Sequence, residues 1–139
     1  MMAIAWVLNV LALFVGVALG ARGLFDPKWA ARLVRLREDG PGGGAEFRAT
    51  YGAMFVGLHL VALAMTGKYL LGGTYVVGVA ASGAAAVLAA GWAGAAFGRV
   101  VSILRDGADT KFNRISVAFE LAIAAFLGAP WVVWYIGFA

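Results

Sequence analysis

The sequence predicts an all-α integral membrane protein, a bundle of four transmembrane helices with a short helix at the cytoplasmic interface. Two observations indicate this class. Of the 139 residues, 63% are hydrophobic and 13% are charged, whereas soluble domains have roughly 45–50% apolar and about 25% charged residues. The apolar residues also gather in four long blocks, and almost all cationic residues lie between or beside these blocks.

The four apolar blocks cover residues 2–21, 47–66, 74–97 and 115–138 of what we expect to be a single domain, residues 1–139. Each block is close to the ~20 residues that a helix needs to cross ~30 Å of hydrocarbon. Because lipid offers no hydrogen bonds, backbone groups must be paired within their own segment, which favours a helix in every block. The short connection at residues 68–73 predicts a hairpin between the second and third helices.

The cationic side chains predict the orientation of these helices. Six Lys and Arg residues lie in or beside the first connection, four lie in the third, and the second has only Lys68. Because cationic loops are retained in the cytoplasm, we expect the first and third connections there and both termini in the periplasm. Richness in Ala, Gly, Val and Arg is compatible with a GC-rich bacterial genome, so the expected location is a bacterial inner (plasma) membrane. The net charge of +4 is attributed to this topology, and no nucleic-acid partner is expected.

The first connection contains a short amphipathic pattern. Asp26 and Pro27 are typical of a helix N-cap and first helical position, and the pattern predicts a helix that continues through Glu38. Four residues are expected at the membrane surface among lipid headgroups: Lys28, Trp29, Arg32 and Arg35. The run Gly40-Pro41-Gly42-Gly43-Gly44 predicts a break and a flexible link. The alternative interpretation is a plain loop that only sets the orientation.

Ionisable and polar residues within the apolar blocks are the main candidates for function. Glu120 lies about one and a half turns inside the fourth block, and we expect it to pair with Arg48 or Arg99. That pair would either lock helices together or form part of a site for a ligand headgroup or a proton. A second polar cluster is expected at Asn9, His59 and Ser82. For His59, a neutral structural role is the alternative to a quinone, haem or proton-relay role.

Small residues recur at every fourth position of the third block. They predict a face on which helices approach closely, either within the chain or against another subunit, and they are Gly78, Ser82, Ala86, Ala90, Gly94 and Gly98. Pro130 predicts a kink in the fourth helix.

Several short motifs resemble those of a known family. They are Glu46-Phe47-Arg48-Ala49-Thr50-Tyr51-Gly52, Gly57, Gly98-Arg99-Val100-Val101-Ser102, Asp106-Gly107 and Glu120. Together they resemble an uncharacterised family of small bacterial four-helix membrane proteins, a domain of unknown function, and the layout is similar to DoxX-like proteins. The resemblance implies a four-helix inner-membrane protein and implies no activity.

The leading functional hypothesis is a non-enzymatic membrane protein that packs with itself or with a membrane protein partner and binds a lipid or other apolar ligand between helices. The ligand-binding residues would be Arg48, Tyr51, Arg99, Ser102 and Glu120. No catalytic residue, metal or cofactor is predicted, and the chain has no cysteine and a single histidine. Two alternatives stay open: a small membrane enzyme or redox and proton-handling accessory subunit, and a component of a lipid or sterol-like carrier.

Overall fold

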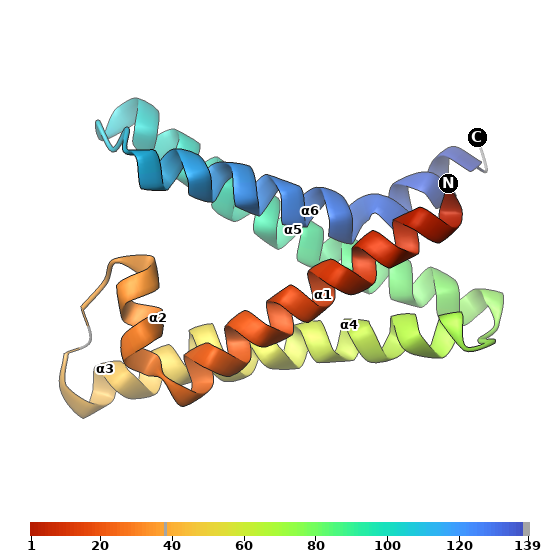
Figure 1. Cartoon of the computed structure of the whole chain (residues 1–139), viewed down its shortest axis with the longest axis horizontal. Helices are drawn as coiled ribbons and strands as arrows, with labels where there is room; N and C mark the ends of the chain where they lie inside the picture. Colours follow the sequence, from red (N-terminus) through yellow and green to blue (C-terminus); the bar gives the residue numbers. More distant parts are fainter. Residues whose placement is uncertain (38, 138–139) are drawn as a thin grey trace. The chain divides into compact units, whose positions relative to one another are not determined.

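The computed structural model describes residues 1–37 and 39–137, which form helices joined by short connections (Figure 1). No described residue lies in a strand, so the predicted all-α class is confirmed. The helices are α1 (Met2–Phe25), α2 (Pro27–Val34), α3 (Gly40–Glu46), α4 (Phe55–Leu70), α5 (Tyr75–Arg105) and α6 (Lys111–Gly137), with a π-helical segment η1 (Phe47–Met54) between α3 and α4.

Within the described residues, four helical stretches are long and apolar enough to cross a membrane. They are Met2–Phe25, Gly40–Leu70, Tyr75–Arg105 and Lys111–Gly137. Each covers one predicted apolar block, except that the third starts one residue after Thr74 and that residue 138, the predicted end of the fourth, lies outside the described residues. The stretches are longer than the blocks because polar turns continue the helices, as at Arg99–Arg105. The chain is therefore a multi-pass membrane protein.

The chain divides into two compact units. The α5–α6 unit comprises Met1–Ala12 and Met65–Ala139, and the α2–η1 unit comprises Leu13–Ala64. Each unit therefore includes part of α1 and part of α4. The assignment of residues 1–139 to one domain stays a prediction.

In the α5–α6 unit, α5 and α6 run side by side (Figure 1). The buried face of α5 is built from small residues: Gly78, Ala81, Ser82, Ala85 and Ala96. The predicted face of small residues is buried at Gly78 and Ser82, whereas Ala90, Gly94 and Gly98 are exposed. A spacing of four residues turns by about 40° per step in a helix of 3.6 residues per turn, so the far end of the series leaves the contact face.

In the α2–η1 unit, α2 begins as predicted. The carboxylate of Asp26 accepts a hydrogen bond of 2.9 Å from the backbone N–H of Trp29, and Pro27 follows as the first helical residue. The helix ends at Val34 and not near Glu38, which itself lies outside the described residues. The reason is that Arg35 adopts a left-handed conformation with φ 59°, which turns the chain away from the helix axis.

The glycine-rich run is helical, so the prediction of a flexible link there is wrong. Asp39 precedes α3, and its carbonyl oxygen accepts a hydrogen bond of 3.0 Å from the N–H of Gly43. Pro41 lies in the first turn, where its fixed φ suits a helix and its missing N–H costs no hydrogen bond. The helical path then continues through η1 into α4, which makes Gly40–Leu70 one stretch of spanning length.

Candidate functional site

The only buried acid among the described residues, Glu120, forms an ion pair with Arg99. Nε of Arg99 donates a hydrogen bond of 2.8 Å to Oε1 of Glu120, which joins α5 to α6. The Glu120 side chain is 8% exposed and the Arg99 side chain is 31% exposed. Of the two predicted partners for Glu120, Arg99 is therefore the one that binds it.

The second oxygen of the Glu120 carboxylate, Oε2, differs from Oε1 in its hydrogen bonding. Oε2 is buried and has no hydrogen-bond partner among the described residues. A buried acceptor without a donor is costly, roughly 1–3 kcal/mol, so such an atom calls for an explanation. On the Arg99 side, the guanidinium carbon lies 5.9 Å from the centre of the Phe112 ring, close enough for a cation–π attraction. The guanidinium is thus held between a carboxylate and an aromatic ring.

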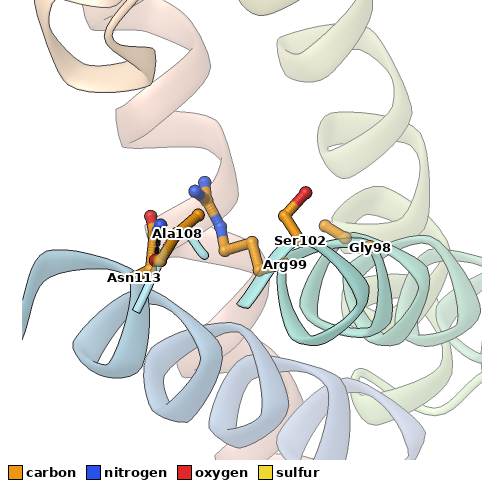
Figure 2. Close-up of a pocket in the computed structure, with 6 residues that line it drawn as sticks. Gly98, Arg99, Ser102, Ala108 and Asn113 are labelled. Carbon is orange, nitrogen blue, oxygen red and sulfur yellow. Dashed lines mark hydrogen bonds between the residues drawn. The ribbon is translucent and has the colours of Figure 1, made fainter. Parts of the chain in front are cut away.

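An open recess of about 400 Å³ lies beside this ion pair. It is lined by Ala95, Gly98, Arg99, Ser102, Ala108 and Asn113. Figure 2 shows Arg99 and Ser102 rising from the same side of α5, with Asn113 and Ala108 at the other edge. Two of the predicted ligand-binding residues therefore line one recess, and a third, Glu120, is bonded to it through Arg99.

The edge of the recess is a tightly bonded turn between α5 and α6. The Asn113 side-chain amide donates a hydrogen bond of 2.7 Å to the carbonyl of Ala108 (Figure 2). The Asn113 backbone N–H donates to the Thr110 hydroxyl oxygen at 3.2 Å, which satisfies one of the free N–H groups at the start of α6. Gly107 has φ 65°, a conformation that glycine adopts at little cost. The sequence analysis singled out Asp106-Gly107 as a motif but missed Asn113.

A family model matches residues 3–134, nearly the whole chain, and its description is "Domain of unknown function (DUF4345)". The chain belongs to the DUF4345 family. The resemblance to an uncharacterised family is therefore confirmed, while the bacterial origin and the DoxX-like layout stay predictions. No curated protein and no solved structure matches the chain.

Other residues predicted as ligand-binding in this DUF4345 chain lie in the α2–η1 unit and have local partners. A guanidinium N–H of Arg48 donates to the backbone carbonyl of Leu24, one of the last carbonyls of α1, where a cation is favoured by the helix dipole. Tyr51 stacks on Phe47, with ring centres 5.4 Å apart. These contacts give Arg48 a capping role and Tyr51 a packing role.

Close helix contact in this unit depends on glycine. A Cβ added at Gly52 would lie 2.6 Å from the Cα of Leu24, far inside normal contact. The π-helical backbone of η1 therefore approaches α1 at a position where no side chain fits. π-helical turns often occur at functional sites, but here the turn accompanies packing between α1 and η1.

The predicted cluster of Asn9, His59 and Ser82 stays a prediction, and Asn9 and Ser82 have hydrogen-bond partners within the α5–α6 unit. Asn9 is bonded to the carbonyl of Leu127 on α6 and to the hydroxyl of Thr66 on α4. Ser82 donates 2.9 Å to the carbonyl of Val79, within its own helix. Sequence reasoning missed Thr66.

His59 bonds within its own helix. Its Nδ1 atom lies 2.8 Å from the carbonyl oxygen of Phe55, which can only accept a hydrogen bond, so Nδ1 carries the proton. A Cβ added at Gly16 would overlap the His59 ring. The imidazole therefore packs directly on the backbone of α1 in the α2–η1 unit.

The residues predicted at the membrane surface lie on or beside α2. Lys28, Arg32 and Arg35 are exposed, while α2 buries Ala30 and Ala31 against Phe47. Trp29 lies beneath the guanidinium of Arg22, 4.6 Å from its ring centre, a contact that the sequence pattern did not reveal. α2 is thus amphipathic, with a cationic outer face.

Asp109, in the connection between α5 and α6, forms an ion pair with Arg114. Both guanidinium contacts between Arg114 and the Asp109 carboxylate measure 2.6 Å. These hydrogen bonds, together with the Arg114 charge, hold the pKa of Asp109 below its usual value. Asp109 is therefore an exposed, ionised partner of Arg114.

Proposed function

We propose that this chain is a non-enzymatic protein of a bacterial inner membrane that binds the polar end of a lipid or other apolar ligand in the recess beside Arg99. The observation that carries the proposal is the set of unused hydrogen-bond donors on the Arg99 guanidinium. Only its Nε–H is hydrogen-bonded among the described residues, and the remaining donors belong to a residue that lines an open recess. An immobilised cation with unused donors is a binding group.

The composition of the recess supports binding in preference to chemistry. Its lining combines three polar residues with three small ones, Ala95, Gly98 and Ala108. Small residues leave room for a ligand, and a few placed polar groups orient it. Two of the acids nearby form ion pairs, Glu120 with Arg99 and Asp109 with Arg114.

A blocking substitution tests the ligand. A Cβ at Gly98 meets no atom within 4 Å, so Gly98→Leu should fill the recess without disturbing the helix contact. The matched control is Gly57→Leu on α4, which also meets nothing within 4 Å and has the same mass. Native mass spectrometry of the purified proteins should show a retained lipid-sized ligand in the wild type and in Gly57→Leu, and little in Gly98→Leu. Equal retention in all three proteins would refute the proposal.

The orientation we propose places both termini in the periplasm and the first and third connections in the cytoplasm, because of their cations. The chain lacks cysteine, so single-cysteine labelling is direct. In intact cells a membrane-impermeant maleimide should label Leu71→Cys, and it should label Asp39→Cys or Asp106→Cys only after lysis. All three substitutions leave the cations in place. Labelling of Asp39→Cys and Asp106→Cys from opposite sides would contradict the topology.

Association with a second copy or with another membrane protein is a further part of this proposal and is supported by the small residues of the helices. A component of a lipid or sterol-like carrier is an alternative to it. Size measurement in detergent, with the detergent mass subtracted, tests the first. A particle of one chain over a wide range of concentrations would count against self-association.

A second candidate function is a proton-handling accessory subunit, and the observation that favours it is the unpartnered Oε2 of Glu120. A proton added to this oxygen displaces no hydrogen-bond donor among the described residues. Infrared spectroscopy should then show a protonated carboxyl band that changes with pH and is absent in Glu120→Gln. If the band is missing at every pH that the protein tolerates, this candidate is excluded.

A further inference from the structure

We propose that the recess beside Arg99 binds a phosphate group, and that an anionic phospholipid supplies it. This inference rests on the proposed function and names the chemistry of its ligand. It follows from the donors that line the recess, from the support of Arg99, from the local charge and from the position of Arg99 along α5.

The donors suit a phosphate. The guanidinium of Arg99 keeps both Nη groups outside its bond to Glu120, and two parallel N–H groups match two oxygens of a phosphate. Ser102 lies three residues further along α5, almost one helical turn, and its hydroxyl points to the same side as the guanidinium (Figure 2). A phosphate held by Arg99 would therefore have a neutral donor within the same recess.

The guanidinium is held in place before any ligand arrives. Glu120 fixes its Nε edge at 2.8 Å, and Phe112 faces it at 5.9 Å. A side chain ordered in advance loses less conformational entropy when a ligand binds. The same support explains why Arg99 and not a more exposed arginine would carry specificity.

The surrounding charge favours an anion. Residues 98–114 contain four cations, Arg99, Arg105, Lys111 and Arg114, and two acids, Asp106 and Asp109. Asp109 is neutralised by Arg114. Arg99 is paired with Glu120, which leaves the exposed charges of Arg105 and Lys111 against that of Asp106. The segment that borders the recess therefore keeps a net positive charge. A ligand with a net negative head gains from this potential, whereas a zwitterionic head has an ammonium group that it repels.

The position of Arg99 on α5 fits the phosphate layer of a membrane. The helix starts at Tyr75, and 24 residues at 1.5 Å each place Arg99 about 36 Å further along the axis. The hydrocarbon core is ~30 Å thick. If Tyr75 marks one interface, as aromatic residues often do, Arg99 reaches the headgroups of the opposite leaflet.

The test measures headgroup selectivity with the full-length protein. Delipidated protein in detergent is titrated with phosphatidylglycerol and phosphatidylcholine of identical acyl chains, and binding is followed by native mass spectrometry. The wild type should prefer phosphatidylglycerol by about tenfold or more, the size of one good charge-assisted interaction. Arg99→Lys keeps the charge but loses the planar fork that matches a phosphate, so it should weaken the binding of both lipids, while Arg105→Lys should leave their binding unchanged. Ser102→Ala should weaken phosphatidylglycerol binding by about threefold to tenfold.

Three outcomes separate the inference from the proposed function. If Gly98→Leu abolishes binding but the wild type takes both lipids equally, the ligand site stands and the assignment to an anionic phospholipid fails. If Gly98→Leu changes nothing, both fail. Inorganic phosphate at millimolar concentration is the third arm. If it binds the wild type but not Arg99→Lys and neither lipid competes with it, the phosphate site stands, its source is a free anion, and the lipid assignment is overturned.

Discussion

The side-chain amide of Asn9 donates a hydrogen bond of 2.9 Å to the backbone carbonyl of Leu127, which joins α1 to α6 across 118 residues. The hydroxyl of Thr66 on α4 donates in turn to Oδ1 of Asn9 at 3.3 Å. Asn9, Thr66 and Leu127 are all fully buried. Pro130 follows three residues after Leu127, and because proline has no N–H it interrupts the backbone hydrogen bonds of α6 at this level. Asn9 therefore adds a donor to the carbonyl next to that of Phe126, which is the one that loses its usual backbone donor at Pro130.

Replacing Asn9 should lower the stability of the protein. Asn9→Leu removes the donor to Leu127 and leaves the Thr66 hydroxyl without its acceptor, so we expect the free energy of unfolding to fall by about 1–3 kcal/mol. Thermal or denaturant unfolding in detergent measures the change. Thr66→Val removes only the longer hydrogen bond and serves as the milder comparison. Unchanged stability in Asn9→Leu would show that the network contributes nothing.

The Arg99–Glu120 pair should respond asymmetrically to substitution. Arg99→Met leaves a buried carboxylate without its cation, and we expect a loss of about 1–3 kcal/mol, below the ~3–5 kcal/mol of a fully buried pair because Arg99 is partly exposed. Glu120→Met leaves a cation that can still reach solvent, so its loss should be smaller. The double variant should recover at least half of the Arg99→Met loss, since an apolar pair has no charge to desolvate. Additive losses in the unfolding measurements would argue against direct coupling.

Gly16 should tolerate no side chain. A Cβ there overlaps the His59 ring, so Gly16→Ala should destabilise the protein by about 1–3 kcal/mol, as overpacking does in other cores. Gly57→Ala, where a Cβ meets nothing within 4 Å, should instead raise stability by about 0.4–1 kcal/mol, because alanine loses less backbone entropy on folding. The two melting curves, recorded in the same detergent, give the answer. If Gly16→Ala melts with Gly57→Ala, the close approach of His59 to α1 is wrong.

The Asp109–Arg114 ion pair should be detectable as a lowered pKa of the Asp109 carboxyl. Because hydrogen bonds from Arg114 and its charge lower the pKa of Asp109, the folded value lies below the unfolded value. The contribution of the pair to stability is then complete above the ordinary aspartate pKa of about 3.9 and is lost as the pH falls through the folded value. Carbon-13 NMR of the Asp109 carboxyl should give a midpoint that rises in Arg114→Gln and stays low in Lys111→Gln. A midpoint that does not move in Arg114→Gln would mean that the pair does not form in solution.

Local chemistry explains which parts of the fold were predictable. The start of α2 at Asp26–Pro27 depends on two adjacent residues, so the sequence pattern was sufficient. Its end depends on the left-handed conformation of Arg35, for which no glycine or asparagine gave a signal. The glycine-rich run looked like a helix breaker, yet it is helical from Gly40, because the preference of single residues is a weak guide when the chain on both sides is ordered.

The sequence predicted which residues belong to the candidate site better than it predicted the contacts between them. Arg99, Ser102 and Glu120 stood out as polar residues at the edge of apolar blocks, and the structure brings them to one recess and its ion pair. Arg48 stood out for the same reason, but it caps α1 at Leu24. No sequence pattern pointed to Asn113, because its role is to hold the turn between α5 and α6 through a hydrogen bond to the carbonyl of Ala108.

The sequence by itself determined that four apolar helices of spanning length would form, because hydrophobicity is a local property and backbone groups in lipid must pair within their own helix. Only the tertiary structure decided that Glu120 binds Arg99 and that Asn9 binds the carbonyl of Leu127. These pairings depend on the rotation of each helix about its axis and on which helices are its neighbours. The sequence does not specify either, because small, lipid-compatible residues lie on several faces of α5.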